Sequence, residues 1–208
     1  ELRTPLSYVK GYSESILQGL VTGEQLDESI RVIAREANRM ERLTNDLMQV
    51  VRREGDMKLD SMPLVYAEVL RDCVQLVEKQ ASMKQIAIDL QLDEGVIVEG
   101  DEERLKQIFI NILENALRYS DIGGQVIVCL FELKGQAVVE IEDHGIGISE
   151  EHLAKVTERF YRVNKARSRK DGGSGLGLSI ALMLVKLHGG TLQIESEMHK
   201  GTIVRVTI

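Results

Sequence analysis

Four short segments between residues 111 and 177 carry side chains and glycines that could together bind a nucleotide. Amide groups, one carboxylate and backbone that can approach a ligand closely are what a magnesium–nucleotide complex requires. Each segment alone is a weak signal, but their order along the chain predicts one site built from all of them. The segments read Asn111-Ile-Leu-Glu-Asn115, Asp143-His-Gly-Ile-Gly147, Arg159-Phe-Tyr-Arg162 and Gly173-Ser-Gly-Leu-Gly177.

The first segment places two amides on one face of a predicted helix, because Asn111 and Asn115 are four residues apart. Their neutral oxygens suit Mg²⁺, which keeps several waters and binds substrate phosphates instead of a complete protein cage. One turn later, Arg118 could reach a phosphate and Tyr119 could offer its ring to a base. Taken alone, however, two asparagines are more typical of a solvated helix face.

The second segment puts a carboxylate at the end of a predicted strand, residues 138–142. Asp143 could accept a hydrogen bond from an exocyclic amine such as that of adenine. Gly145 and Gly147 would let the backbone approach the ligand. His144 is expected to be a turn residue and not a catalyst. The alternative for this segment is an ordinary turn that contains an aspartate.

The last segment opens a predicted helix at residues 175–188. Glycines before a helix present free N–H groups to an anion, which the helix dipole also favours. No strand leads into these glycines and no Lys-Ser/Thr pair follows them, so neither a dinucleotide fingerprint nor a P-loop fits. The basic stretch 165–170 before them is interpreted as a lid over a triphosphate, with a solvated basic loop as the alternative.

Composition describes an ordinary globular chain of 208 residues, with 43% hydrophobic and 28% charged residues. The net charge of −7 argues against a general nucleic-acid binder, which is usually basic. Cys73 and Cys129 lie far apart in apolar runs and are expected to be free core thiols in a reducing compartment. Every apolar run is shorter than the roughly 18 residues that span a bilayer, so membrane contact is expected only through segments absent from this chain.

Residues 2–53 have a helical period that is interrupted at 19–24. A short break of this kind favours an antiparallel hairpin of two helices. A second copy of the chain would cover the apolar stripe and form a dimeric four-helix bundle; the alternative is that the stripe packs on the rest of its own chain. On the second helix the stripe repeats every three or four residues, as Leu26, Ile30, Ile33, Ala37, Met40, Leu47 and Val51.

Beyond the expected boundary at 52–56, helical and strand patterns are mixed. The fold class predicted is α+β, with a helical hairpin at 1–54 and an α/β sandwich at 57–208. In the sandwich, helices lie on one face of a mixed, largely antiparallel sheet. The helices are predicted at 66–81, 101–119 (with Asp101 as N-cap), 149–155 and 175–188. The strands are predicted at 86–92, 96–98, 124–133, 136–142, 191–196 and 202–208.

The four segments resemble the N, G1, F and G2 boxes of sensor histidine kinases of two-component systems, whose ATP-binding domain has the Bergerat fold. The opening Glu1-Leu-Arg-Thr-Pro-Leu6 resembles the H box of the same family, so the resemblance covers essentially the whole chain. It implies a protein-histidine kinase that transfers the γ-phosphoryl group of ATP to a histidine and then to an aspartate of a response regulator. Phosphatase activity toward that regulator is also compatible with it.

The resemblance implies roles for individual residues of the nucleotide site. Asn111 and Asn115 would be the Mg²⁺ ligands, and Asp143 would bind the adenine amine. Phe160 would anchor the lid, and Arg162 could stabilise the γ-phosphate. The residues implied to contact ATP are, in chain order, Asn111, Asn115, Arg118, Tyr119, Asp143, Gly145, Gly147, Phe160, Arg162, Gly173, Gly175, Leu176 and Gly177.

At the N-terminus the resemblance implies Glu1 as the acid/base partner of the phosphoacceptor, and Thr4 resembles the position that orients water during dephosphorylation. With Asn111 and Arg162, these are the implied catalytic residues. The phosphoacceptor histidine is expected immediately before Glu1, so the chain as given should bind ATP without phosphorylating itself at the usual site. The implied partners are a second copy, through the hairpin, and a receiver domain. The implied location is the cytoplasmic side of a bacterial inner or plasma membrane.

Two other functions fit parts of the pattern. Related Bergerat-fold ATPases, of the topoisomerase, heat-shock chaperone and mismatch-repair types, place a glutamate where Asn111 stands, as the base that activates water. An amide cannot take up a proton at neutral pH, so Asn111 disfavours hydrolysis and preserves ATP for transfer. A nucleotide-binding scaffold that binds regulators through its hairpin is the non-enzymatic alternative.

Overall fold

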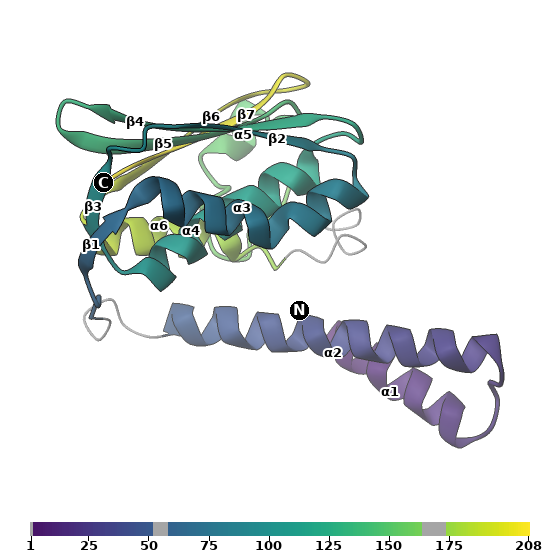
Figure 1. The fold of residues 1–208 in the computed structure, drawn as a ribbon. Coiled ribbons are helices and arrows are strands. Elements are labelled where there is room, and N and C mark those ends of the chain that lie inside the picture. Colours follow the sequence, from purple (N-terminus) through teal and green to yellow (C-terminus); the bar gives the residue numbers. More distant parts are fainter. Residues whose placement is uncertain (1, 52–57, 164–173) are drawn as a thin grey trace. The chain divides into compact units, whose positions relative to one another are not determined.

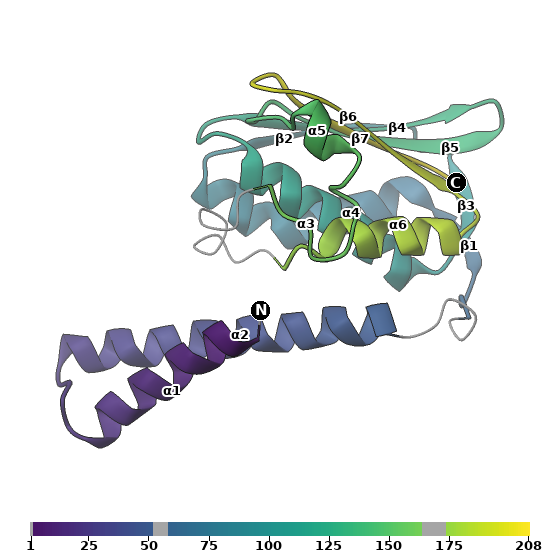
Figure 2. The ribbon, with the colours of Figure 1, turned by 180° about the vertical axis from the view of Figure 1, so that it is seen from behind.

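The computed structural model describes residues 2–51, 58–163 and 174–208, which form two compact units. The first contains α1 (Arg3–Leu17) and α2 (Glu24–Val51), and the second contains the other described helices and strands (Figures 1 and 2). The expected boundary at 52–56 lies outside the described residues. No helix within the described ranges is both long and apolar enough to cross a bilayer.

The first unit is a hairpin of two helices, as the sequence predicts. Gly19, just beyond the end of α1, takes a φ of +67°, which favours glycine over any other residue. The N–H groups of Gly19 and Leu20 donate to the carbonyls of Ile16 and Ser15, each at 3.0 Å, and this Schellman motif closes the helix. The turn therefore stops α1 and lets the chain reverse into α2.

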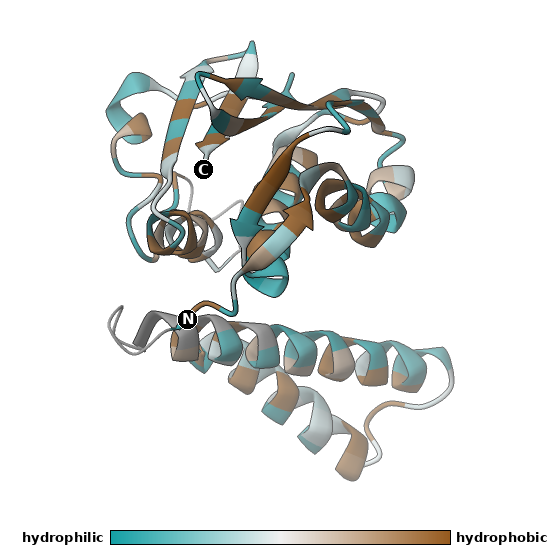
Figure 3. Ribbon diagram, turned by 60° about the vertical axis from the view of Figure 1, so that its left-hand side comes forward, coloured by the Kyte–Doolittle hydropathy of each residue, from teal (hydrophilic) through white to brown (hydrophobic). Residues whose placement is uncertain are grey.

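The buried face of α2 differs from the predicted apolar stripe. Ile30, a member of that stripe, is 51% exposed. Figure 3 shows apolar and polar residues alternating around both helices. Because each residue turns an α-helix by about 100°, the buried residues of α2 are centred about a quarter turn around the helix from the stripe. These buried residues are Ser29, Val32, Glu36 and Leu43. Packing within the hairpin thus leaves much of the stripe open, and its coverage by a second copy stays a prediction.

The second unit is a five-stranded sheet with helices on one face. The strand order is β2-β4-β5-β7-β6, with β2 and β4 parallel and the other neighbours antiparallel. The α/β sandwich with a mixed, largely antiparallel sheet is therefore confirmed. The strands are β2 (Ala87–Leu92), β4 (Gln125–Leu133), β5 (Gln136–Asp143), β6 (Thr191–Glu197) and β7 (Gly201–Thr207). The helices on the sheet are α3 (Tyr66–Met83), α4 (Glu102–Tyr119) and α6 (Gly177–Leu187).

The core lies between the sheet and these helices, because alternate residues of each strand face the helices. On β4, Val126 and Val128 are buried, whereas Cys129 beside them is only partly buried. Cys73 on α3 is fully buried, and both thiols are free. The expectation of core thiols is therefore confirmed for Cys73 and wrong for Cys129, which occupies the opposite face of its strand.

A small second sheet is absent from the sequence predictions. β1 (Met62–Val65) pairs antiparallel with β3 (Ile97–Gly100), which includes part of the predicted strand 96–98. β1 is only four residues long and contains Pro63, so its sequence lacks a strand signal. Because α3 follows β1 directly and α4 begins soon after β3, this pair fixes where both helices start.

Helix α4 is held at both of its ends. The Asp101 carboxylate accepts a hydrogen bond from the N–H of Arg104 at 3.1 Å, which confirms the predicted N-cap. At the other end, Lys84 Nζ donates to the carbonyl oxygens of Leu117 and Arg118 at 2.8 and 2.7 Å. A positive charge there also interacts favourably with the helix dipole. The helix that carries the two predicted amides is thus firmly positioned.

Candidate functional site

The start of α6 lies against the middle of α4. A Cβ atom on Gly177 would lie 3.3 Å from Oδ1 of Asn111, so a larger residue would press on the asparagine. Nδ2 of Asn111 is buried and has no hydrogen-bond partner among the described residues. Asn115 follows one turn later and is partly exposed. A buried amide left unpaired costs free energy, so Asn111 is suited to a ligand that completes its hydrogen bonds.

The loop after β5 packs on the C-terminal end of α4. The N–H of Ile146 donates to the carbonyl of Tyr119 at 3.3 Å, and a Cβ atom on Gly145 would overlap that same oxygen. Glycine is therefore sterically required where the helix and the loop meet. The contact brings Asp143 to the end of α4 that carries Tyr119, whose side chain is 43% exposed.

The same loop is held on its other side by the turn between β6 and β7. Gly147 has a φ of +66°, and a Cβ atom there would overlap the carbonyl oxygen of Glu197. The N–H of His199 donates to the carbonyl of Ile146 at 2.9 Å. Close backbone packing thus requires glycine at 147 as well, and the loop is fixed between the turn and α4.

Asp143, the last residue of β5, is a buried carboxylate that is 7% exposed. Burial raises the pKa of its carboxyl group, although hydrogen bonds from the N–H groups of Gly145 (2.9 Å) and Thr202 oppose the shift. Strand pairing places Asp143 opposite Thr202, and a Cβ atom on Gly201 would overlap the carbonyl oxygen of Asp143. A carboxylate held in this way can select a ligand that offers it a hydrogen-bond donor.

Three residues that support Asp143 are not identified by sequence patterns, namely Ser196, Gly201 and Thr202. Ser196 Oγ accepts a hydrogen bond from the N–H of Ile148 at 2.8 Å and donates to the carbonyl of Gly201 at 2.7 Å. It also lies 2.9 Å from Oγ1 of Thr202. Gly201 and Thr202 can be seen in the sequence as the start of the last strand. Only the strand register of the structure shows that they lie beside Asp143.

The raised pKa of Asp143 predicts a pH dependence of stability. The carboxyl group loses its proton near its ordinary value of 3.8 in the unfolded chain and at higher pH in the folded chain. Between these two pH values the folded state binds more protons, so this group's contribution to the free energy of unfolding should decrease as pH rises. Urea unfolding at several pH values should show the decrease. Asp143→Asn should lose it, and parallel pH profiles for the two proteins would contradict this assignment.

The third and fourth segments meet at Phe160 and Gly175. The N–H of Phe160 donates to the carbonyl of Gly175 at 2.9 Å, and their φ angles are +63° and +72°. A Cβ atom on Gly175 would lie 3.0 Å from the carbonyl carbon of Phe160, so this close contact needs glycine. Phe160 is 45% exposed, and Arg162 is partly buried. Leu176 is fully buried, so its side chain positions the segment through core packing.

A residue of the third segment also has a partner that the sequence does not reveal. The hydroxyl of Tyr161 lies 2.7 Å from Nδ1 of His152 on α5 (Glu150–Leu153). The side chain of Tyr161 thereby ties the segment to a short helix that contacts β6. No local sequence pattern predicts the contact between Tyr161 and His152, because the conformation of the loop between them brings the two side chains together.

The remaining predicted residues lie elsewhere or beyond the described part of the chain. Glu1, Gly173 and the basic stretch 165–170 are outside the described residues. Thr4 is exposed on α1, in the other unit. His144 is an exposed residue of the turn after β5, as expected.

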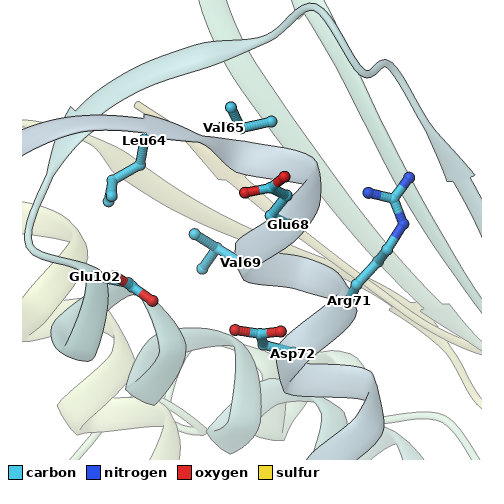
Figure 4. A pocket seen from close by; sticks show the side chains of 7 residues that line it. All are labelled: Leu64, Val65, Glu68, Val69, Arg71, Asp72 and Glu102. Atoms are coloured by element: carbon cyan, nitrogen blue, oxygen red, sulfur yellow. The ribbon is translucent and has the colours of Figure 1, made fainter.

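A separate hollow of about 370 Å³ lies between β1, α3 and the start of α4 (Figure 4). None of its lining residues belongs to the four segments. Lys106 Nζ lies 2.8 Å from a carboxylate oxygen of Asp72 and 2.7 Å from one of Glu102, so two acidic groups of the hollow have a partner within the protein. The hollow therefore lacks the features expected of the nucleotide site. It is lined by Leu64, Val65, Glu68, Val69, Arg71, Asp72 and Glu102.

Two protein-family models match the chain. Residues 1–56 match the His Kinase A (phospho-acceptor) domain. Residues 100–208 match the family of histidine kinase-, DNA gyrase B-, and HSP90-like ATPases. The first match contains the helical hairpin, and the second contains all four segments of the candidate site.

Similar proteins agree with these matches. The sensor protein SrrB of Staphylococcus aureus (strain N315) is 36% identical over 210 residues, which cover 97% of this chain and 35% of SrrB. This chain thus spans about a third of the length of the curated relatives it matches. The structure of ShkA in complex with AMPPNP has a TM-score of 0.76 and 25% identity, covering 99% of this chain and 43% of ShkA.

The histidine kinase ThkA, solved in complex with the response regulator protein TrrA, has the same fold. Its TM-score is 0.81 at 23% identity, covering 100% of this chain and 58% of that chain. The family models, the SrrB relatives and the shared fold lead to one assignment. This chain belongs to the sensor histidine kinases.

Proposed function

We propose that this chain is the catalytic portion of a two-component sensor kinase, with a dimerisation and phosphotransfer hairpin at 1–54 and an ATP-binding domain at 57–208. Its activity is transfer of the γ-phosphoryl group of ATP to a histidine next to Glu1, and then to an aspartate of a response regulator. The observation that carries the proposal is the meeting of Asn111, the Asp143 loop and the glycine that opens α6 on a single helix, α4.

The residues around α4 fit a magnesium–ATP complex. Asn111 and Asn115 offer amide oxygens to Mg²⁺, and the unpaired buried Nδ2 of Asn111 is suited to a bound partner. Asp143 is a buried acceptor for the adenine amine. In the described ranges, no group of three or more His, Cys, Asp or Glu side chains could hold a metal ion. Coordination by amides, phosphates and water, as Mg²⁺ prefers, is compatible with such a site.

When bound, ATP supplies the phosphoryl group, and the protein supplies positioning and charge stabilisation. Asn111 occupies the position where related ATPases have a base, and its amide cannot accept a proton from water. Asn111 would therefore hold Mg²⁺ without promoting hydrolysis of ATP. With ATP bound, Arg162 would place positive charge near the γ-phosphate, and Glu1 would manage the proton of the phosphoacceptor imidazole.

The partners of the whole protein are part of the same proposal. A second copy covers the open stripe of α2 and completes a four-helix bundle. Membership of the sensor histidine kinases supports a receiver domain as the second partner, and Thr4, exposed on α1, is available to orient water in dephosphorylation. Segments outside this chain anchor the protein in a bacterial membrane and leave these domains on its cytoplasmic side.

A charge placed on the open stripe should separate the dimer. Ile30→Asp would bury an uncompensated carboxylate in the interface, which should weaken association by about 100-fold. Size-exclusion chromatography with light scattering should show monomers at concentrations at which the unchanged chain is dimeric, while ATP affinity stays the same. Asn38→Asp adds the same charge at an exposed position about a third of a turn from the stripe. Equal dissociation by both variants would argue against the stripe as the interface.

Calorimetric titration with ATP, in the presence and absence of Mg²⁺, tests the proposed function. We expect one magnesium-dependent site per chain, with little phosphate released after binding. Steady phosphate release over many turnovers would favour a hydrolytic ATPase. A chain that binds no ATP under either condition would remove the nucleotide site from the proposal.

A further inference from the structure

Asp101 joins three separate parts of the second unit. Its carboxylate accepts hydrogen bonds from the N–H of Arg104 through Oδ1 and from the N–H of Asp60 through Oδ2, each at 3.1 Å. Its own N–H donates to Nε2 of His188 at 3.2 Å. One residue therefore caps α4, binds the segment that enters β1, and contacts the residue that ends α6.

His188 can make this contact in one tautomer only. Its Nδ1 lies 2.8 Å from the carbonyl oxygen of Leu184, and a carbonyl only accepts, so Nδ1 carries the proton. Nε2 is then unprotonated and accepts from the N–H of Asp101, one of the donors that a helix N-terminus leaves unpaired. Gly100 leaves room at this junction, because a Cβ atom there would lie 2.8 Å from Cδ1 of Leu105 and 3.3 Å from Cδ2 of His188.

This junction lies at the opposite end of the α4–α6 pair from the nucleotide site. α6 begins at Gly177 beside Asn111 and ends next to His188 beside Asp101. Because a helix rises about 1.5 Å per residue, the two contacts are roughly 15 Å apart along each helix. α6 is thus held against α4 at both of its own ends, beside the middle of α4 and beside the N-cap of α4. A change in the spacing between α4 and α6 at His188 would tilt α6 and move Gly177 relative to Asn111.

We propose that His188 and Asp101 are positioning residues for the nucleotide site. His188, as a neutral hydrogen-bond acceptor, sets the spacing of α4 and α6, and Asp101 ties that spacing to the segment entering at Asp60. The inference rests on the proposed ATP site, because the spacing affects function only if α4 and α6 bind nucleotide. The far end of the helix pair thus has a role in shaping the site, although its residues do not contact ATP.

The matched variants His188→Gln and His188→Met test this role in the complete 208-residue chain. The two side chains are similar in length, but only glutamine can accept from the Asp101 N–H strongly, through Oε1. We expect the Kd for Mg–ATP to rise about tenfold in His188→Met and by less than about threefold in His188→Gln. A merely structural role would lower the melting temperature without separating the two Kd values, so equal Kd values would overturn the proposal.

Hydrogen exchange on the unchanged chain is a second test, which does not depend on a variant folding. Saturating Mg–ATP should slow exchange of the Asp101 and Asp60 amides by about threefold or more, because binding stabilises the α4–α6 arrangement. The amide of Gly135, in the turn between β4 and β5, serves as the control. Unchanged exchange at both junction amides would overturn the proposal and leave the ATP site intact, whereas failure to bind ATP at all would contradict the proposed function itself.

Discussion

Asn115→Ala is expected to abolish binding of Mg–ATP at concentrations that saturate the unchanged chain. Asn115 projects from the same face of α4 as Asn111, one turn closer to the loop that follows Asp143. In the proposed site the amide of Asn115 is a ligand for Mg²⁺, so its removal should weaken binding of the metal and of the phosphates. A loss of about 3 kcal/mol in binding free energy corresponds to a roughly 100-fold rise in Kd, which titration calorimetry can measure.

The fold should survive this change, since Asn115 is partly exposed and alanine favours a helix. The melting temperature is therefore expected to stay within a few degrees of that of the unchanged chain. Asn38→Ala, the same substitution at an exposed position of α2, should leave the Kd unaltered. Full ATP affinity in Asn115→Ala would mean that this face of α4 does not bind the nucleotide.

Gly201→Ala is expected to destabilise the second unit and to remove nucleotide binding with it. Gly201 has a φ of +119°, and a Cβ atom there would overlap the carbonyl oxygen of Asp143. Relief of the overlap requires β7 to move away from β5, which breaks the pairing of Asp143 with Thr202. Overpacking and backbone strain together should cost about 3 kcal/mol or more. Scanning calorimetry should show a melting temperature lower by roughly 10 °C.

Gly135→Ala separates backbone strain from steric overlap. Gly135 also has a positive φ, +79°, but no atom lies within 4 Å of a Cβ atom placed there. This variant should lose only about 1 kcal/mol and should bind ATP normally. Similar losses of stability in the two variants would show that the contact between Gly201 and Asp143 is unimportant.

The elements and motifs that depend on neighbouring residues are the ones that the sequence predicts well. The Asp101 cap and the helix that follows it are read from a local pattern, and so is the hairpin formed by β4 and β5. The four segments of the candidate site are recognisable from their order, and the structure gathers their described parts around α4, while their binding of a nucleotide stays a prediction. The cap, the helix and the hairpin each depend on short-range spacing, which a local sequence pattern reports directly.

What the sequence does not reveal depends on strand register and on contacts between distant elements. Thr202 reaches Asp143 only because β7 pairs with β5 in one register, and β1 forms only because β3 lies beside it. Cys129 faces away from the helices because its neighbours on β4 face them. In each case the deciding contact joins residues far apart in the chain, so no local pattern records it.

The buried face of α2 is a helical example of a contact that a local sequence pattern does not record. A three–four repeat identifies the apolar stripe, but the repeat does not say which helix covers it. Within the hairpin the buried residues, including Val32 and Glu36, are centred about a quarter turn from the stripe, which leaves Ile30 half exposed. Two adjacent faces of α2 can therefore serve two contacts, one with α1 and one with the proposed second copy.

Phosphoryl transfer to histidine is tested most directly by incubating γ-labelled ATP and Mg²⁺ with a version of the chain that carries a histidine immediately before Glu1. Acid-labile, base-stable label is predicted on this version and none on the chain that begins at Glu1. Asn115→Ala in the histidine-bearing version should remove the label, because ATP no longer binds. No label on either protein, together with steady release of phosphate, would contradict transfer to histidine and would identify an ATPase instead.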